Sequence, residues 1–463
     1  MSEHLHFMGV GGVSMSGLAR HYLAAGARVS GCDGVASATL EALRELGIDV
    51  TVGHAPDHLD GVDALVVSAA IDEDAPELRE AVARGIPVRR RIDLLADLFH
   101  RYRAIGVTGT HGKSTTSGMI ATILLASGGD PAVQLGATLP ALAGVMRYGE
   151  GAHLVAEVDE SDPGFAGLDA DVAVVTNLED DHIAGEHDER RTYHASLGDL
   201  EAALTAYAGR ARVLVACADW AGLNELLAGH PATVRYGEAE DADYRVEDLR
   251  LEPTGSRFRL RGPDAEVEVA LHVPGRHNVL NAAGALAAAH RAGVPLAAGA
   301  AALARFTGVG RRWQQWGEVR GALVIDDYAH HPTEVAATLE AARATGRRVR
   351  AVLQPHRWVR TARHWPALAD AAALADEVLV LDVYGAGERA IPGVSSERIA
   401  ARLRDGGHRA ECHDLASAEH YLAGTLAPGD LVITLGAGDV WRVAQALVEH
   451  EGRTPGTLAP EGS

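Results

Sequence analysis

Residues 109–116 read GTHGKSTT, between the apolar run RAIGV at 103–107 and the helically spaced run SGMIATILLAS at 117–127. This order predicts a strand, a glycine turn and the first turn of a helix. Backbone N–H groups at a helix start attract an anion, and the helix dipole adds to that attraction. A lysine adds positive charge, and a serine hydroxyl can reach Mg²⁺. The stretch therefore predicts a phosphate-binding loop made of Gly109, Thr110, Gly112, Lys113, Ser114 and Thr115.

The turn is shorter than that of the general P-loop. The general motif has glycine at the position where this chain carries Val107, so the turn here runs from Gly109 to Gly112. An ordinary turn with a surface lysine is the alternative. The agreement of residue type, order and context favours phosphate binding.

The composition is that of a globular protein with several domains. A length of 463 residues predicts about three domains, and 47% hydrophobic with 23% charged residues allows an ample core. The 63 acidic residues exceed the 42 basic ones, and the formal charge of −21 argues against a broad nucleic-acid-binding surface. We therefore expect no nucleic-acid partner, and anion binding only in local pockets.

Cysteine usage and the length of apolar runs bear on the compartment. Cys32, Cys217 and Cys412 are far apart and odd in number, so their spacing indicates neither a disulfide framework nor a zinc cluster. The N-terminal residues MSEHLHFMGVGG lack the basic segment and long apolar run of a signal peptide. No stretch approaches the apolar length that spans a membrane. We expect a cytoplasmic chain without membrane insertion.

Strand and helix patterns alternate along most of the chain, which predicts an α/β fold. The alternation falls into three blocks, which we expect to be domains at 1–100, 101–312 and 313–463. Within the second block, residues 231–274 are short, alternating and rich in Arg and Glu. They predict antiparallel hairpins added to that domain.

Residues 9–17, GVGGVSMSG, resemble the glycine turn of dinucleotide-binding proteins, although Ser14 occupies the third glycine position. Asp33 follows at roughly the distance expected for a ribose contact. The glycine pattern alone also suits a tight turn without a ligand. The diphosphate of any nucleotide would fit it as well as NAD does.

Polar residues follow two strands of the second block. EVDESD ends an apolar run, which places Glu157 at the carboxyl edge of a parallel sheet, where α/β proteins bind ligands. Mg²⁺ takes hard oxygen ligands, so Glu157 is a candidate metal ligand, with a helix cap or salt bridge as the alternative. TNLEDDH places His182 at the same edge, either as a less usual Mg²⁺ ligand or as a polar loop residue.

Three further stretches carry polar side chains. In PGRHNVLNAA, Asn278 and Asn281 stand three apart at a predicted helix start, where they either read a base edge or cap the helix. IDDYAHHPTEV at 325–335 and QPHRWVRT each follow a predicted strand of the third block. The latter carries Arg357 and Arg360, and the forked guanidinium of arginine suits carboxylate or phosphate.

Together these stretches resemble the Mur ligase family of peptidoglycan synthesis, nearly from end to end. Some are weak singly, but the ordered set is highly specific. The family uses GTxGK[ST] in place of the standard P-loop, which accounts for the short glycine turn. The stretches that carry the resemblance are GVGGVSMSG, GTHGKSTT, EVDESD, TNLEDDH, GRHNVLNAA, GRRWQQWG, DDYAHHPTE, QPHRWVRT, DVYGAGE and LGAGD.

The resemblance implies three domains. A Rossmann-like N-terminal domain would hold a UDP-sugar, and a central P-loop-type α/β domain with added antiparallel hairpins would bind ATP. A Rossmann-like C-terminal domain would close over ATP and bind the amino acid. The implied substrates are UDP-N-acetylmuramate and L-alanine, joined through an acyl phosphate, with ATP and Mg²⁺ as cofactors. The oligomeric state stays open between a monomer and a weak homodimer.

The resemblance also implies roles for single residues. Catalysis would involve Lys113, Glu157, His182 and His330, the last as the base for the incoming amine. The metal would be bound by Ser114, Glu157 and His182. Beyond the phosphate loop, ATP would contact Asn278, Asn281, Arg312 and Asp327. The other substrates would contact Gly9, Gly11, Gly12, Ser14, Ser16, Asp33, Ser68, His187, Tyr328, His330, Arg357 and Arg360.

Three other interpretations stay open. A ligase that joins UDP-N-acetylmuramate to a preformed murein peptide would share most of these motifs. An NAD(P)-dependent oxidoreductase would account for the first glycine turn but leaves GTHGKSTT and the third block unexplained. A non-enzymatic nucleotide-binding regulator is disfavoured by intact Lys113, Glu157 and His182.

Overall fold

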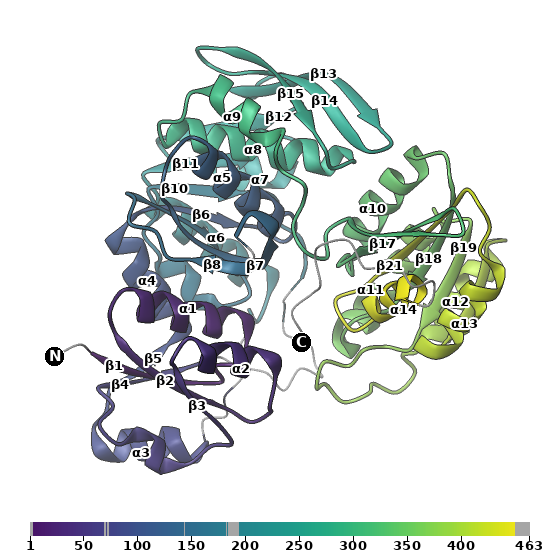
Figure 1. The fold of residues 1–463 in the computed structure, drawn as a ribbon. Helices are drawn as coiled ribbons and strands as arrows, with labels where there is room; N and C mark the ends of the chain where they lie inside the picture. The colour runs from purple at the N-terminus through teal and green to yellow at the C-terminus, as the bar shows by residue number, and fades with distance from the viewer. Residues whose placement is uncertain are drawn as a thin grey trace.

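The computed structural model describes residues 3–68, 71, 74–142, 144–181, 183 and 194–449. Figure 1 shows three domains that follow one another along the chain, from purple through teal to yellow. Each domain is built on its own sheet, and the three sheets have five, ten and six strands. The predicted α/β class with three domains is confirmed.

The N-terminal domain contains a parallel sheet in the order β3-β2-β1-β4-β5. The order reverses beside β1, so a ligand-binding crevice is expected at the carboxyl ends of β1 and β4. The strands are β1 (His4–Met8), β2 (Arg28–Asp33), β3 (Asp49–Val52), β4 (Ala64–Val67) and β5 (Val88–Arg90). The helices are α1 (Val13–Ala24), α2 (Ala38–Glu45), η1 (Pro56–Leu59), α3 (Pro76–Arg84) and α4 (Arg91–Arg101).

The central domain contains a sheet in the order β15-β14-β13-β12-β11-β10-β6-β9-β7-β8. Its strands are β6 (Arg103–Thr108), β7 (Ala132–Leu139), β8 (Gly144–Arg147), β9 (His153–Glu157), β10 (Val172–Val175), β11 (Val213–Cys217), β12 (Thr233–Gly237), β13 (Tyr244–Glu252), β14 (Gly255–Arg261) and β15 (Glu266–Leu271). Its helices are α5 (Lys113–Ala126), η2 (Pro140–Leu142), η3 (Pro163–Gly167), α6 (Leu197–Arg210), α7 (Ala221–Leu226), α8 (Arg276–Arg291) and α9 (Leu296–Leu303).

The middle of this sheet is parallel, and its two ends are antiparallel. β13, β14 and β15 form the antiparallel hairpins expected within 231–274, and β7 with β8 forms another at the opposite end. The first strand of the stretch, β12, instead pairs in parallel with β11 and β13. The hairpins therefore extend the parallel sheet rather than form a separate one.

The C-terminal domain contains a sheet in the order β16-β17-β21-β18-β19-β20, in which β16 runs antiparallel to a parallel remainder. Its strands are β16 (Gln314–Val319), β17 (Ala322–Asp327), β18 (Arg348–Leu353), β19 (Glu377–Leu381), β20 (Arg409–His413) and β21 (Asp430–Leu435). Its helices are α10 (Pro332–Ala344), α11 (Trp358–Ala372), α12 (Ser396–Asp405), α13 (Leu415–Thr425) and α14 (Trp441–Glu449).

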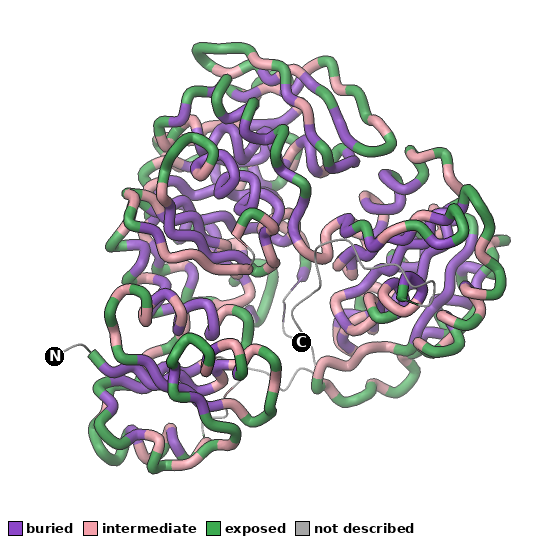
Figure 2. Tube along the Cα trace, in the orientation of Figure 1, coloured by how far each residue is buried: buried purple, intermediate pink, exposed green. Residues whose placement is uncertain are grey.

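The central strands of the sheets are apolar along their length because they lie in the core. Figure 2 shows buried segments running through the middle of each domain. All four residues of β10 are buried, as is nearly all of β6, because helices cover both faces of a parallel sheet. α5 is buried from Ser114 to Leu124 and packs on the alanine-rich α8, whose small side chains allow close approach. This packing fixes the start of α5 at the sheet edge.

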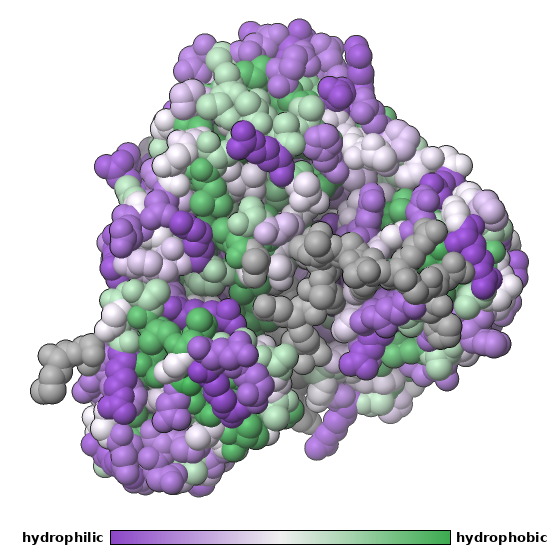
Figure 3. All heavy atoms as spheres, viewed as in Figure 1, coloured by the Kyte–Doolittle hydropathy of each residue, from purple (hydrophilic) through white to green (hydrophobic). Residues whose placement is uncertain are grey.

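Hydrophilic side chains lie mainly at the periphery of the molecule. On the face shown in Figure 3, hydrophilic residues occupy the outer edges of all three domains. Among the described residues, no helix combines the length and apolarity that crossing a membrane requires.

Gly106, in the middle of β6, is packed tightly against a tyrosine of α6. A Cβ on Gly106 would lie 2.2 Å from the hydroxyl oxygen of Tyr207, which donates to the Gly106 carbonyl (3.1 Å), and 3.0 Å from the ring of Phe99. We expect Gly106→Ala to lower the free energy of unfolding by about 1–3 kcal/mol, because overpacking displaces both rings. Urea denaturation followed by tryptophan fluorescence would measure the change.

The matched control is Gly209→Ala on the exposed side of α6, where an added Cβ has no heavy atom within 4 Å. Alanine should be neutral there or raise stability by up to about 1 kcal/mol. Equal urea midpoints for the two variants would contradict the packing described for β6.

Candidate active site

The predicted phosphate loop joins β6 to α5 and is held from two sides. Gly109 and Gly112 have backbone φ angles of 125° and 84°, which favour glycine. A Cβ on Gly109 would lie 2.3 Å from the hydroxyl oxygen of Thr176, and one on Gly112 would lie 2.5 Å from the amide oxygen of Asn281. The loop therefore lies directly against the end of β10 and against α8, and only glycine fits at these two positions.

Lys113 begins α5 and folds back over the loop. Its Nζ donates to the carbonyl oxygens of Gly109 (2.7 Å) and Thr110 (3.1 Å) and lies 2.8 Å from Oε2 of Glu160. Burial alone would lower the pKa of Lys113, but Glu160 and its neighbouring carboxylates outweigh burial and raise that pKa. The ammonium therefore stays charged at neutral pH. Lys113 is also the only lysine among the 463 residues, since every other basic position holds arginine.

Side chains with oxygen atoms that could bind a metal follow Lys113 in the chain and end the neighbouring strand. Ser114 and Thr115 are buried in the first turn of α5. Glu157 ends β9, the strand next to β6, and its carboxylate accepts from the backbone N–H of Gly136 (2.8 Å). A serine hydroxyl and a carboxylate are hard oxygen ligands of the kind that Mg²⁺ takes together with phosphate. The residues present at this edge therefore fit a Mg²⁺ ion.

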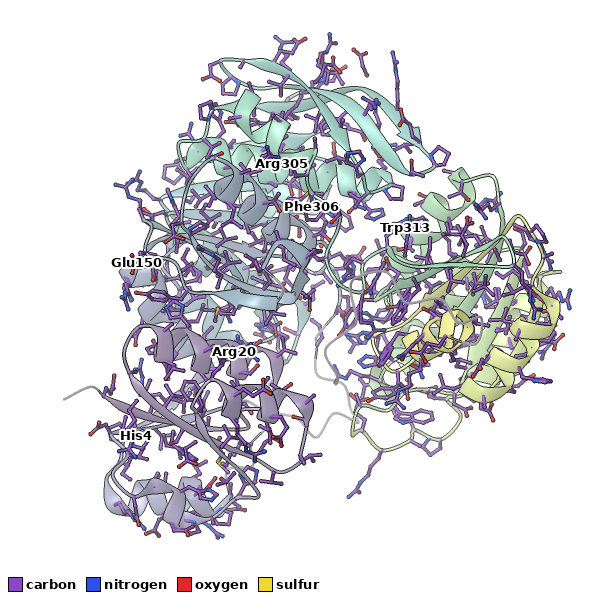
Figure 4. All side chains as sticks on the ribbon, viewed as in Figure 1. His4, Arg20, Glu150, Arg305, Phe306 and Trp313 are labelled. Atoms are coloured by element: carbon purple, nitrogen blue, oxygen red, sulfur yellow. The ribbon has the colours of Figure 1, made fainter. Side chains whose placement is uncertain are left out.

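A cavity of about 150 Å³ lies beside the loop, where the central and C-terminal domains meet. Most of its exposed wall is apolar, although polar side chains also line it, and α8 supplies two amides, Asn278 and Asn281. Asn278 donates to the carbonyl of Pro274 (2.7 Å) and accepts from Nδ2 of Asn281 (3.3 Å), so both amides are fixed. Phe306 and Trp313, labelled in Figure 4, line the cavity from the two sides of the domain joint. An apolar slot with a few fixed amides suits a planar base.

Arg312 and Asp327 form another part of the cavity wall. The carboxylate of Asp327 accepts from the backbone N–H groups of Trp313 and Ala329, each at 2.8 Å. Burial raises the pKa of Asp327 to about 6, against the opposing effect of Arg312. The guanidinium of Arg312 lies 4.9 Å from the ring centre of Tyr328. Asp327 thus fixes the backbone where the chain enters the third domain.

Two carboxylates connect the phosphate loop to the C-terminal domain. His111 lies 2.8 Å from Glu179 through Nε2 and 3.2 Å from Glu334 through Nδ1. Glu179 also accepts from Oγ1 of Thr333 (2.8 Å) and lies 3.0 Å from Nδ1 of His331. The sequence does not single out these residues, although each lies inside one of the polar stretches described above. No single-residue signal marked them, because their role arises from contacts between domains.

The arginines expected at the substrate are already paired with carboxylates. Nε and Nη2 of Arg360 each lie 3.0 Å from a different oxygen of Asp181, which gives a two-pronged contact. Asp181 belongs to TNLEDDH in the central domain, so this contact crosses the joint. Arg357 pairs with Glu388 within the third domain. The structure therefore brings one of the two arginines to the central site.

His330 lies near these arginines as a neutral imidazole. Its Nδ1 donates to the carbonyl oxygen of Tyr328 (2.8 Å), which leaves the lone pair on Nε2. Burial, reinforced by the charge of Arg360, lowers the pKa of His330 to about 3. The imidazole ring is 5.7 Å from that of His356, which in turn contacts Arg360 at 3.2 Å.

The turn after β1 is shaped by Asp33. The carboxylate of Asp33 accepts from the backbone N–H of Gly11 (2.9 Å), and a Cβ on Gly11 would lie 2.8 Å from the same carboxylate. Gly9 has a φ of 80° and donates to the carbonyl of Cys32 (2.8 Å). A Cβ on Gly9 would lie 3.1 Å from Oγ of Ser68. Asp33 builds the turn, and its expected ribose contact stays a prediction.

The remaining expected residues divide into two groups. Gly12 precedes α1, Ser14 is half-buried in its first turn, and the buried Ser16 donates to a backbone carbonyl of its own helix (3.0 Å). The hydroxyl of Ser16 is thus used inside the helix. His182 and His187 lie outside the described residues.

A lysine-bearing glycine loop beside a cavity, at the joint of two α/β domains, is an arrangement typical of enzymes that use nucleotides. Similarity to known proteins narrows this class. Three family models match the chain. The model described as "Mur ligase family, catalytic domain" matches residues 4–103, "Mur ligase middle domain" matches 107–289, and "Mur ligase, glutamate ligase domain" matches 311–438. The chain belongs to the Mur ligase family.

Individual relatives agree with this assignment. The UDP-N-acetylmuramate--L-alanine ligase of Deinococcus radiodurans is 44% identical, over 96% of this chain and 94% of the relative. That of Streptomyces coelicolor is also 44% identical, over 96% and 97%. The solved UDP-N-acetylmuramate-alanine ligase of Thermotoga maritima is 28% identical, with a TM-score of 0.82 over 97% of this chain and 99% of that one. A murein peptide ligase from Psychrobacter arcticus, 23% identical with a TM-score of 0.69 over 98% and 99%, shares the fold.

Because of the two carboxylates beside His111, the stability of the protein should fall as the pH becomes alkaline. Burial opposes protonation, but Glu334 and Glu179 outweigh burial and raise the pKa of His111 from 6.5 to about 9. The stabilisation from the charged imidazole is therefore fully present below pH 6.5 and is lost as the pH rises through about 9. The shift corresponds to at most about 3 kcal/mol.

Urea midpoints measured between pH 6.5 and 9.5 (roughly the pKa interval and half a unit beyond it) would check this. Wild type should lose stability across that range, and His111→Asn should lose less of it. The exposed His272→Asn should follow wild type. Parallel profiles for all three proteins would show that His111 is not charged in the folded state.

Proposed function

We propose that this chain is an ATP-dependent ligase that joins L-alanine to the lactyl carboxylate of UDP-N-acetylmuramate, releasing ADP and phosphate, in peptidoglycan precursor synthesis. The observation that carries the proposal is the lysine-bearing phosphate loop beside a cavity with fixed amides. Relatives similar along nearly the whole chain favour L-alanine over a preformed peptide, and a ligase over an oxidoreductase.

Each domain takes one part of this reaction in the proposal. Residues 1–100 bind the UDP-sugar, with its diphosphate at the turn over Gly9–Gly17. Residues 101–312 bind ATP and the metal. Residues 313–463 close over ATP and bind the amino acid. The position of the cavity between the central and C-terminal domains supports this division.

The first step activates the carboxylate, because a carboxylate does not react with an amine at neutral pH. The γ-phosphoryl group moves from ATP to a lactyl oxygen, which gives an acyl phosphate and ADP. Lys113 exchanges Glu160 for phosphate oxygens and offsets the repulsion between the two anions. A bound Mg²⁺ neutralises phosphate charge, and Ser114, Glu157 and His182 are the residues that would hold it.

The second step forms the amide bond. The amine of L-alanine attacks the acyl carbon, phosphate leaves, and the amine must lose a proton. His330 takes that proton at Nε2, the nitrogen that Tyr328 leaves unused. The low pKa of His330 arises from burial and Arg360, so an acyl phosphate bound at Arg360 would offset part of that charge and raise the pKa.

Closure of the third domain protects the acyl phosphate from water. The contacts of His111 with Glu334 and of Arg360 with Asp181 already join the second and third domains. Asn278, Asn281, Arg312 and Asp327 would then surround the base and ribose of ATP from both sides of the joint.

We also assign this reaction to the cytoplasm. ATP and sugar nucleotides are used there, and Cys32, Cys217 and Cys412 are unpaired thiols, as a reducing compartment requires.

The decisive experiment measures phosphate release from the purified protein with ATP, Mg²⁺ and UDP-N-acetylmuramate. L-alanine, an L-alanyl-D-glutamyl tripeptide, or no acceptor is then supplied. We expect L-alanine to stimulate release and to add its residue mass to the sugar nucleotide. Stimulation by the tripeptide alone would transfer the protein to the peptide-ligating branch. No release with any acceptor would contradict the ligase assignment.

Lys113→Ala should abolish ligation while the fold survives, because the site loses the only ammonium beside the phosphates. We expect a fall in kcat of at least about 10³-fold, comparable to the loss of one electrostatic donor in other enzymes. Circular dichroism would confirm folding. Near-normal activity of this variant would show that Lys113 does not act on the phosphates of ATP.

The single lysine allows a second test of the same contact on the wild-type protein. Reductive ¹³C-methylation should give one side-chain NMR signal besides that of the N-terminal amine, because Lys113 has no other lysine to compete with it. ATP should slow the modification of Lys113 and leave that of the N-terminus unchanged. Equal labelling rates with and without ATP would contradict the contact.

A further inference from the structure

A second cluster of polar side chains lies in the N-terminal domain, away from the phosphate loop. It consists of His6 on β1, Cys32 on β2, His58 in η1 and Glu77 on α3. One ligand atom from each residue lies within 4.8 Å of all the others. His6, Cys32 and Glu77 are 2%, 0% and 0% exposed, so three of the four are almost fully removed from water.

The hydrogen bonds of His6 leave one ring nitrogen unsatisfied. Nδ1 of His4, the residue labelled in Figure 4, lies 2.9 Å from the carbonyl of Gly61 and must donate to it. With neutral imidazoles, Nε2 of His4 then accepts from Oγ of Ser30 (2.9 Å), and Ser30 accepts from Nδ1 of His6 (2.9 Å). Nε2 of His6 therefore carries a lone pair, and it is buried without a partner.

A buried lone pair without a donor is costly, and it needs a physical reason. The chain from Gly61 through His4 and Ser30 fixes both the tautomer and the ring of His6. Histidines that bind metal are held in this way, with the second nitrogen hydrogen-bonded to a fixed partner. Ser30 leaves Nε2 as the nitrogen of His6 that is able to bind a cation.

Cys32 and His58 both contact Glu77. The carboxylate of Glu77 lies 3.3 Å from Sγ of Cys32 and 2.5 Å from Nδ1 of His58. His54 completes the surroundings, since its Nδ1 is 3.2 Å from Cys32 and 3.3 Å from Glu77. The thiol of Cys32 and the imidazoles of His54 and His58 thus all contact the one buried carboxylate of Glu77. A cation between them would satisfy all of these groups at once.

We propose that His6, Cys32, His58 and Glu77 form a structural binding site for a divalent transition metal, Zn²⁺ by its ligand chemistry. Thiolate, imidazole and carboxylate are all ligand types of zinc, and four such ligands match the tetrahedral coordination of its closed sites. Mg²⁺ is disfavoured, because it prefers oxygen ligands and water. Binding replaces the proton on Sγ of Cys32, which passes to solvent, so affinity should rise with pH.

The site would stiffen the turn that the proposed UDP-sugar site uses. The metal would join β1, β2, η1 and α3 through one ion. The carbonyl of Cys32 accepts from the backbone N–H groups of Gly9 (2.8 Å) and Val10 (3.1 Å), which begin the glycine turn. Cys32 would therefore bind the metal through its side chain and hold the glycine turn through its backbone carbonyl. This inference concerns the N-terminal domain alone and does not depend on the ligase reaction.

The test uses the full-length protein stripped of metal and titrated with Co²⁺ and Zn²⁺ in the absence of ATP. We expect one equivalent of Co²⁺ to give the visible bands of tetrahedral coordination and a near-ultraviolet thiolate-to-metal charge-transfer band, both displaced by Zn²⁺. Native mass spectrometry should find one zinc per chain. Zn²⁺ should also raise the melting temperature.

Variants assign the ligands. Cys32→Ser should remove the charge-transfer band and weaken Zn²⁺ binding by more than about 100-fold, whereas Ser30→Ala should keep the band and weaken binding by about 10–100-fold. Cys217→Ser and Cys412→Ser remove the other two thiols and should bind as wild type does. Folding of each variant would be checked by circular dichroism without metal.

Three results would overturn the proposal. The first is a stripped wild-type protein that gives no thiolate band with Co²⁺. The second is a band that survives Cys32→Ser but disappears in Cys217→Ser or Cys412→Ser. The third is Co²⁺ that binds in octahedral geometry alone and responds to ATP added at the end of the titration, which would place the metal at the phosphate loop instead. Because the wild-type titration alone decides the first result, a variant that fails to fold does not leave the proposal untested.

Discussion

The contact between the ammonium of Lys113 and the carboxylate of Glu160, 2.8 Å apart, is the interaction around which the central domain is arranged. A buried ammonium is stable only beside a carboxylate, and a buried carboxylate only beside a cation. The loop can hold Lys113 in this place because Gly109 and Gly112 allow it to lie flat against β10 and α8. The ends of β6, β9 and β10 therefore converge on one charged group.

The same loop also governs how the domains meet. His111 stands between the two glycines, and its ring reaches Glu179 in the central domain and Glu334 in the C-terminal domain. His111 thus contacts α10 of the C-terminal domain through Glu334. The loop and the third domain therefore contact each other directly, through a residue two positions from Lys113.

Much of the fold and the centre of the site follow from local sequence, and the rest does not. GTHGKSTT specifies its own strand, turn and helix, so the loop could be predicted from residue order alone. The contacts of Glu179 and the cluster around Glu77 join residues from separate elements, which no spacing rule brings together. Asp33, Arg357 and Arg360 show a different limit. Their residue types indicate ligand binding, but only the structure shows the protein groups that already occupy them.

Those occupied partners follow one rule. Lys113 lies against Glu160, Arg360 against Asp181, and Arg357 against Glu388, so each of these three cations proposed to meet an anionic substrate is held by a carboxylate of the chain. Binding a phosphate or carboxylate then exchanges one anion for another, and the cation need not be stripped of water again. In a chain with a formal charge of −21, such internal pairing confines anion binding to the few places where a cation is already desolvated and aimed.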